Sequence, residues 1–184
     1  MRFKDILGNE RLWAAVYDGE MEDVLTKTFS QWMDLNTLYA FFEKNATDLA
    51  AYFHITDISQ AVFETVSDAV SMKAVLLEIG PDGHLDQLFR PLENSRIKEM
   101  VLSREKAKGA RKFGHTSWLR IYALKFEPDT YLITGGAIKL TRTMGEREHT
   151  RKELLRMDQV RAFLLGQGVV DLEGFKDINH EKNY

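Results

Sequence analysis

The sequence contains no cysteine, only three prolines and no long apolar run. Without cysteine, the chain has no thiol nucleophile, no cysteine zinc site and no disulfide framework, which suits a reducing compartment. Three prolines leave little room for a disordered linker, and 184 residues suffice to bury a core without disulfides or metal. The N-terminus has scattered charges rather than an apolar signal region, and no window approaches the ~20 apolar residues of a membrane span. These absences predict one ordered domain over residues 1–184, in the cytoplasm and with no membrane partner.

The net charge of −3 hides an asymmetry between the two halves of the chain. Residues 1–95 carry 7 basic and 16 acidic side chains, which gives a net charge of −9. Residues 96–184 carry 18 basic and 12 acidic side chains, which gives a net charge of +6. Nine of the basic residues lie between positions 96 and 125. Such a block can attract phosphates or an acidic partner, but it can equally be the solvated face of a helix that docks against the acidic half.

The spacing of apolar residues predicts a helix-rich first half. The run at residues 12–17 predicts a short strand that ends at a turn. Apolar residues then recur at intervals of three and four in three segments, which predict helices over residues 20–33, 35–53 and 58–77. Asp57 or Thr56 is in position to cap the last of these helices.

The second half changes to a strand pattern. Ser95 can cap a basic helix over residues 96–108, and the β-rich runs at 118–126 and 131–140 predict an antiparallel hairpin. Capping-box spacing after Thr143 and Thr150 predicts a helix that begins near one of them and reaches Gly166, followed by a frayed tail. The predicted fold class is therefore α+β, with a small antiparallel sheet, an N-terminal helical elaboration and a C-terminal helix.

Two adjacent glycines interrupt the second strand of this hairpin. Gly135 and Gly136 are followed by Lys139, but the spacing is not that of a phosphate-binding loop. Because the glycines lie inside a strand pattern, they predict a bulge or a close approach of another backbone.

Residues 139–153 concentrate cations, carboxylates and one imidazole where a strand ends and a helix begins. Backbone amides point outward at such a place, so a phosphodiester could bind there. The alternative is a solvated helix with ion pairs such as Glu148 with Lys152, and with His149 as a surface residue. The five histidines of the chain are dispersed, and neither a metal motif nor a cofactor fingerprint is present, so we expect no metal and no cofactor.

The order of elements resembles the RelE/ParE-like toxin superfamily of prokaryotic toxin–antitoxin systems. Residues 119–122, Leu-Arg-Ile-Tyr, are similar to the central strand of that family with its arginine. Residues 138–143, followed by 146–149, are similar to its last strand and basic exit. The resemblance covers residues 118–160 and, more loosely, 12–33. The acidic helical half has no obvious counterpart in the family.

The resemblance implies a site and a reaction. In the ribonuclease members, a basic sheet face binds mRNA in the ribosome, and the RNA 2′-hydroxyl attacks the adjacent phosphate without a metal. Such attack needs cations where charge develops and a group that transfers a proton near neutral pH. Carried over, the expected catalytic residues are Arg120, Arg142, Arg147 and His149, with His149 as the acid or base. The expected RNA-binding residues are Lys139, Lys108, Arg111 and Lys112.

Two hypotheses about function follow. The first is a RelE-like toxin that binds RNA, acts as a ribosome-dependent, metal-independent endoribonuclease and is restrained by a separate antitoxin protein. The alternative is a non-catalytic module whose basic half binds a protein or nucleic acid, and the sequence leaves open whether the chain is an enzyme. The first hypothesis requires the four expected catalytic residues and Lys139 to converge in one concave site, whereas the second lets them scatter.

Overall fold

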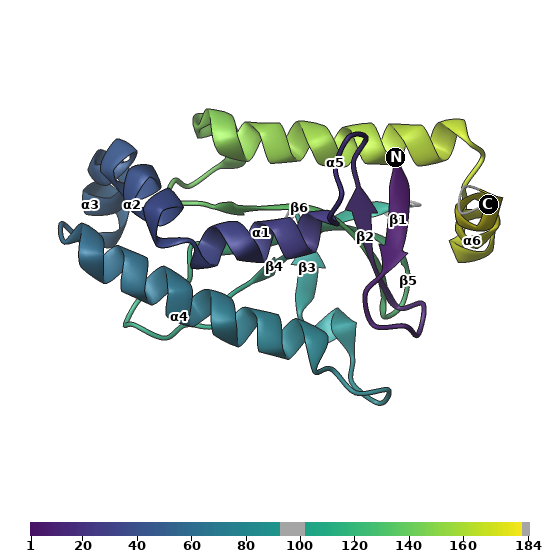
Figure 1. Ribbon diagram of the computed structural model, residues 1–184, viewed down its shortest axis with the longest axis horizontal. Helices are drawn as coiled ribbons and strands as arrows, with labels where there is room; N and C mark the ends of the chain where they lie inside the picture. The colour runs from purple at the N-terminus through teal and green to yellow at the C-terminus, as the bar shows by residue number, and fades with distance from the viewer. Residues whose placement is uncertain (93–101, 182–184) are drawn as a thin grey trace.

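The computed structural model describes residues 1–92 and 102–181, which fold as an α+β structure (Figure 1). The elements within these ranges are β1 (Arg2–Asp5), β2 (Leu12–Val16), α1 (Val24–Met33), α2 (Leu35–Lys44), α3 (Ala46–Phe53), α4 (Ile58–Leu77), the short 3₁₀ helix η1 (Leu85–Gln87), β3 (Phe89–Pro91), β4 (Ser103–Lys108), β5 (Leu119–Glu127), β6 (Thr130–Ile138), the 3₁₀ helix η2 (Met144–Glu146), α5 (Glu148–Gly166) and α6 (Leu172–Glu181).

The strands form one six-stranded sheet in the order β1-β2-β6-β5-β4-β3. Neighbouring strands are antiparallel except β2 and β6, which are parallel. The α+β class is as predicted, but the sheet is larger than predicted and mixed. It is larger because β1, β2 and β3 from the acidic half join the strands of the basic half. The acidic and basic halves of the chain therefore share one sheet.

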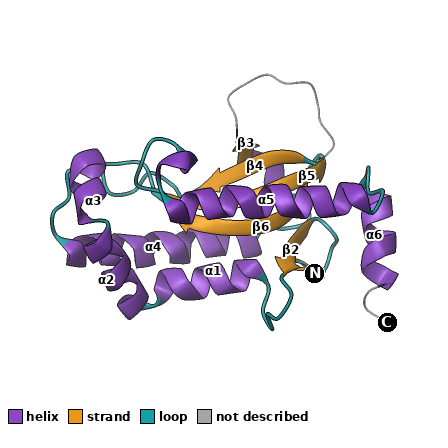
Figure 2. Cartoon of the chain, turned by 90° about the horizontal axis from the view of Figure 1, so that it is seen from above, coloured by secondary structure: helices purple, strands orange, loops and turns teal. Residues whose placement is uncertain are grey.

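Helices cover both faces of the sheet. Helix α5 lies across one face and packs mainly on β6 and β5, while α1 and α4 lie against the other face (Figures 1 and 2). Helices α2 and α3 form one end of the molecule (Figure 1). The largest fully buried side chains come from both the sheet and the helices, and they include Trp118, Tyr122, Tyr131, Phe29, Phe42 and Phe175.

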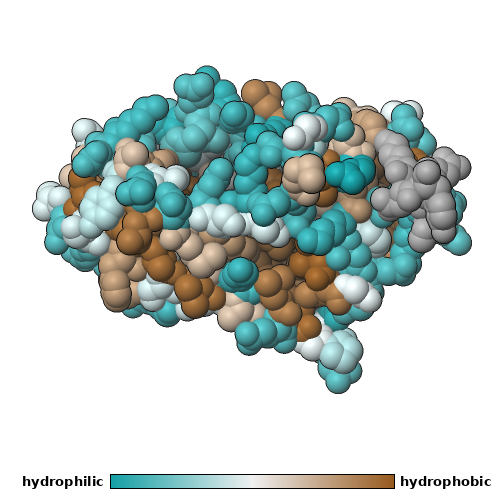
Figure 3. All heavy atoms as spheres, in the orientation of Figure 1, coloured by the Kyte–Doolittle hydropathy of each residue, from teal (hydrophilic) through white to brown (hydrophobic). Residues whose placement is uncertain are grey.

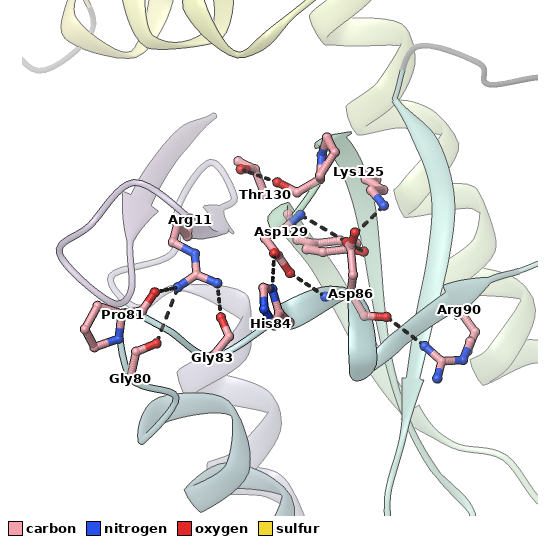
Figure 4. Close-up of polar contacts among 12 residues, drawn as sticks. Arg11, Gly80, Pro81, Gly83, His84, Asp86, Arg90, Lys125, Asp129 and Thr130 are labelled. Atoms are coloured by element: carbon pink, nitrogen blue, oxygen red, sulfur yellow. Dashed lines mark hydrogen bonds and ion pairs between the residues drawn. The ribbon is translucent and has the colours of Figure 1, made fainter.

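The predicted hairpin is confirmed as β5 and β6, at the centre of the sheet. Its turn consists of Pro128 and Asp129, and Asp129 has a φ of 58°, a conformation that aspartate tolerates better than most residues. The backbone N–H of Asp129 donates to the carboxylate of Asp86, and the backbone N–H of Asp86 donates to the carboxylate of Asp129 (Figure 4). Lys125 adds an ion pair to Asp86 at 2.9 Å. The turn is therefore fixed to the segment that leads into β3.

The sequence predicted a bulge or the close approach of another backbone at Gly135 and Gly136, and side chains of the helices on both faces come close to the sheet there. A Cβ on Gly135 would lie 1.8 Å from the Glu153 carboxylate of α5, and a Cβ on Gly136 would lie 2.6 Å from Thr28 of α1. The pairing of β5 with β6 also shifts register beside Gly135, between Tyr122 and the next residue of β5. The two glycines thus set the distance between the sheet and the helices on either side.

Three predicted elements are wrong. The predicted helix over residues 96–108 is a strand where it is described, because residues 103–108 pair with β5; its remaining residues, 96–101, lie outside the described ranges. The predicted helix over 35–53 ends at Asn45, whose side chain donates to the Phe41 carbonyl, and restarts as α3. The tail predicted as frayed forms α6, because Phe175 is buried there against aromatic rings of the core.

The other predicted helices are confirmed with small shifts of their ends. Helix α1 begins at Val24 after the N-cap Asp23, and α4 spans the predicted range with Asp57 as its cap. The outer side of α4 exposes apolar residues, including Phe63 and Val70, and Figure 3 shows apolar side chains gathered on the side where α1 and α4 lie. Within the described ranges, no helix combines the length and apolar character needed to cross a bilayer.

We predict that Gly136→Ala lowers the free energy of unfolding by about 1–3 kcal/mol, because the added methyl group meets both Thr28 and the Arg120 carbonyl in a packed region. Gly166→Ala is the control, since nothing lies within 4 Å of its Cβ position, and a change within about 0.5 kcal/mol is expected. Urea denaturation followed by circular dichroism measures both. Equal stability of the two variants would show that the close approach at Gly136 does not limit packing.

Candidate functional site: a basic pocket beside helix α5

A cavity of about 430 Å³ lies on the face of the sheet that α5 covers only in part. Its floor comes from β4 and β5, and its wall comes from the segment between β6 and α5. The lining residues are Leu92, Arg104, Lys106, Lys108, Arg120, Tyr122, Lys139, Arg142, Thr143, Met144, Gly145 and Leu154. None of these residues is acidic, and six of them carry a basic side chain.

The alternation of strand β4 brings three of the cations together. Successive side chains of a strand point to opposite faces, so Arg104, Lys106 and Lys108 share the face that lines the cavity. Glu105, between them, is buried on the other face. Because α5 packs mainly on β6 and β5, the face of β4 lies beside the helix rather than under it (Figure 2).

Strand β5 supplies the deepest part of the floor. Its pairing with β4 places Arg120 opposite Lys108 and Tyr122 opposite Lys106. Arg120 is only 8% exposed, and its guanidinium donates to the carbonyls of Ser117 and Leu119 at 2.6 and 2.7 Å. These bonds fix the guanidinium but bring no negative charge to it.

The wall of the pocket is held by its own polar contacts. The Lys139 ammonium donates to the carbonyls of Thr141 and Arg142, both at 2.6 Å. Thr143 and Glu146 form the capping box that their spacing predicted, although it caps η2 rather than the long helix, which begins at Glu148. The wall therefore presents Arg142 and Lys139 from a compact segment.

Burial and mutual repulsion lower the pKa values of the three pocket lysines. Arg120 is the main cause of the lowered pKa of Lys108, and burial, followed by Lys108 and Arg120, lowers the pKa of Lys106. Burial, followed by the charge of Arg120, lowers the pKa of Lys139 to about 8. Arg104 has an ion pair outside the lining, with Asp158 at 3.0 Å. A bound polyanion would relieve this repulsion.

Tyr122 adds a polar group to the pocket floor. Its hydroxyl is buried and has no hydrogen-bond partner among the described residues, which is a costly arrangement. Burial raises the pKa of Tyr122, so the hydroxyl stays protonated and keeps its capacity to donate.

The pocket brings together four of the residues expected from the sequence: Arg120, Arg142, Lys139 and Lys108. The sequence reasoning missed Arg104, Lys106 and Tyr122. Their signal was present as the alternation of basic residues over 104–108, which fits a strand with one basic face as well as it fits a basic helix.

Arg147 and His149 do not line the pocket. The Arg147 guanidinium binds the Asp48 carboxylate of α3, with two contacts of 2.6 Å. The Nε2 atom of His149 lies 2.8 Å from the Ile138 carbonyl, and its ring packs edge-on against Phe41 at 5.2 Å between centroids. The convergence required for the enzyme hypothesis is therefore met by Arg120, Arg142 and Lys139, and not by these two residues.

Arg111 and Lys112 lie in the loop between β4 and β5, outside the pocket. Arg111 donates to the Gly114 carbonyl within the loop, and Lys112 donates to Ser71 of α4 at 2.5 Å. Lys112 thus lies on the side of the sheet away from α5. Within the described ranges, no group of three or more histidine, aspartate or glutamate side chains is placed to hold a metal ion.

Comparison with known proteins finds no matching family model, no matching curated protein and no matching solved structure.

We predict that the contribution of Lys139 to stability rises with pH. Its folded-state pKa of about 8 lies below its ordinary value of 10.5, so between these values the unfolded chain binds more protons and stability increases with pH. Urea denaturation of wild type and Lys139→Met at pH 7 and pH 10 measures this, because titrations shared by both proteins cancel in the difference. The free energy of unfolding of the wild type minus that of the variant is expected to be larger at pH 10 than at pH 7. A difference that is the same at both pH values would mean that Lys139 keeps its ordinary pKa.

Proposed function

We propose that the chain binds RNA through phosphate groups in the basic pocket, as the RelE-like interpretation of the sequence expects. The observation that carries the proposal is a cavity of about 430 Å³ whose lining, among the residues that the structure describes, includes six basic side chains and no acidic one. This volume lies within the usual range of ligand pockets, roughly 300–1,000 Å³.

Phosphate is the group that this pocket fits best. Arg104, Lys106 and Lys108 form a row along β4, and cations in a row match successive phosphates of a nucleic-acid backbone. The Tyr122 side chain also belongs to the floor, whereas the Thr143 hydroxyl of the wall already donates to Glu146.

The proposal includes the partners that the resemblance implies. RNA on the ribosome is one, and an antitoxin protein is the other. An antitoxin that inhibits by covering the pocket would have to present carboxylates, because the lining residues that the structure describes are rich in cations and include no acidic side chain.

We predict that removing two pocket cations weakens RNA binding by roughly tenfold or more and lowers the salt dependence. In Lys108→Gln/Arg142→Gln, the slope of log affinity against log salt should fall by on the order of 0.7 for each phosphate that the protein no longer neutralises. Fluorescence anisotropy with a labelled single-stranded RNA, titrated at several salt concentrations, measures both quantities.

The matched control is Arg111→Gln/Lys112→Gln, which removes the same charge outside the pocket. It should retain most of the affinity and the wild-type salt slope. Equal losses in the two double variants would mean that RNA binds to the general positive charge of the chain rather than to the pocket. Displacement of the RNA by a nucleoside triphosphate at low concentration would show that the pocket instead prefers a free polyphosphate.

RNA cleavage is a second candidate function, favoured by the pKa of about 8 of Lys139. A group with a pKa near the working pH can transfer protons efficiently. In this reaction, the 2′-oxygen bonds to the adjacent phosphorus and the bond to the 5′-oxygen breaks, which leaves a 2′,3′-cyclic phosphate and a 5′-hydroxyl. Neutral Lys139 accepts the 2′-hydroxyl proton, water protonates the leaving oxygen, and Arg120 and Arg142 stabilise the negative charge on the non-bridging oxygens of the phosphate.

We predict that Lys139→Arg separates cleavage from binding, because arginine keeps the positive charge but does not lose its proton. Expressed in a bacterial host, the wild type should arrest growth and produce new mRNA ends, and the variant should do neither while binding RNA within about twofold of wild type. Arrest by both proteins would exclude Lys139 as the proton acceptor. Normal growth with the wild type, together with intact RNA binding in vitro, would favour the non-catalytic binding module.

A further inference from the structure

Helix α3 of the acidic half is bonded directly to the wall of the basic pocket. Asp48 is 6% exposed, and its two carboxylate oxygens accept from Nε and Nη2 of Arg147 in a bidentate pair. The Arg147 hydrogen bond holds the pKa of Asp48 below its ordinary value. Arg147 follows η2, the 3₁₀ turn that carries the pocket residues Met144 and Gly145.

Further contacts join the same two parts of the chain. The Tyr52 hydroxyl of α3 lies 3.4 Å from the Glu146 carboxylate, which accepts from both the backbone N–H and the hydroxyl of Thr143. On the neighbouring helix α2, the ring of Phe41 packs against His149. Acidic and aromatic side chains of α2 and α3 therefore contact the segment from Thr143 to His149 at several points.

Hydrogen bonds within this segment and to the start of α5 connect these contacts to the residues that line the pocket. The Thr150 hydroxyl donates to the Met144 carbonyl at 2.6 Å, and Arg151 donates to the Gly145 carbonyl at 3.0 Å. The Thr141 hydroxyl donates to the Thr143 carbonyl at 3.0 Å. Because the carbonyls of the wall are tied in this way, a displacement of Arg147 would be transmitted to the residues that line the cavity.

We propose that α2 and α3 hold the pocket wall, residues 141–147, in the position that binds RNA, with Asp48 as a positioning residue that acts through Arg147. The inference rests on the proposed function of the pocket. It gives Arg147 and His149, which do not line the cavity, the role of anchors, and it gives the acidic helices a part in forming the basic site.

The substitution Asp48→Ala tests the proposal because the loss of its charge and the loss of its positioning role change the affinity for RNA in opposite directions. Removing a negative charge raises the attraction of the protein for RNA, so electrostatics alone gives tighter binding. Loss of the anchor gives weaker binding. Alanine favours helix, which offsets the loss of a carboxylate from the first turn of α3.

The matched control is Glu43→Ala, which removes the same charge from the exposed surface of α2. Two measurements are made on both variants and on the wild type, all confirmed as folded by circular dichroism at the assay temperature. The first is affinity for a labelled single-stranded RNA by fluorescence anisotropy. The second is hydrogen exchange of the peptide that contains residues 141–147, compared with a peptide from the β5–β6 hairpin.

The expected result is that Asp48→Ala weakens RNA binding by about fivefold or more and speeds exchange in residues 141–147 but not in the hairpin. Glu43→Ala should bind RNA at least as tightly as wild type, with unchanged exchange. RNA binding by Asp48→Ala that equals or exceeds that of wild type overturns the positioning role and leaves the pocket function intact. If the wild type binds no RNA, the pocket function and this inference both fail.

Discussion

The pairing of β5 with β6 is the constraint on which the rest of the structure depends. This hairpin occupies the centre of the sheet, so β2 and β4 attach to its two edges, and α1 and α5 pack on its two faces. Gly135 and Gly136 let both helices approach the same short stretch of β6. Helix α5 is thereby placed over the middle of the sheet, and the cation-bearing face of β4 stays beside it rather than beneath it.

The position of α5 decides the chemistry of the pocket. A helix centred on β4 would bury three cations, which is very costly, whereas the observed arrangement leaves them around an open cavity. Burial, together with the repulsion that remains, lowers the pKa values of Lys106 and Lys139, and repulsion by Arg120 is the main cause for Lys108. A site that keeps like charges close together is suited to bind anions, but the repulsion between these charges lowers the free energy of unfolding.

The acidic half of the chain contributes to this site through packing and one specific ion pair rather than through a general attraction between oppositely charged halves. Its strands β1, β2 and β3 complete the sheet, and its helices α2 and α3 contact the segment that follows β6. The pair of Asp48 with Arg147 joins residues 99 positions apart in the sequence. Such a partnership has no local signal, because neither residue differs in its sequence surroundings from an ordinary surface charge.

The α+β class, the central hairpin, the cap of α4 and the basic character of the second half were predictable from the sequence, because they depend on periodicity, turn residues and charge that act over a few positions. The sequence also indicated Arg120, Lys139, Arg142 and Lys108 for the pocket. Only the tertiary structure decided that residues 103–108 form a strand, that Arg104 and Lys106 complete the site, and that Arg147 and His149 bind protein groups instead. The physical reason is that strand pairing and helix packing join residues far apart in the chain, and such long-range partners override local preference.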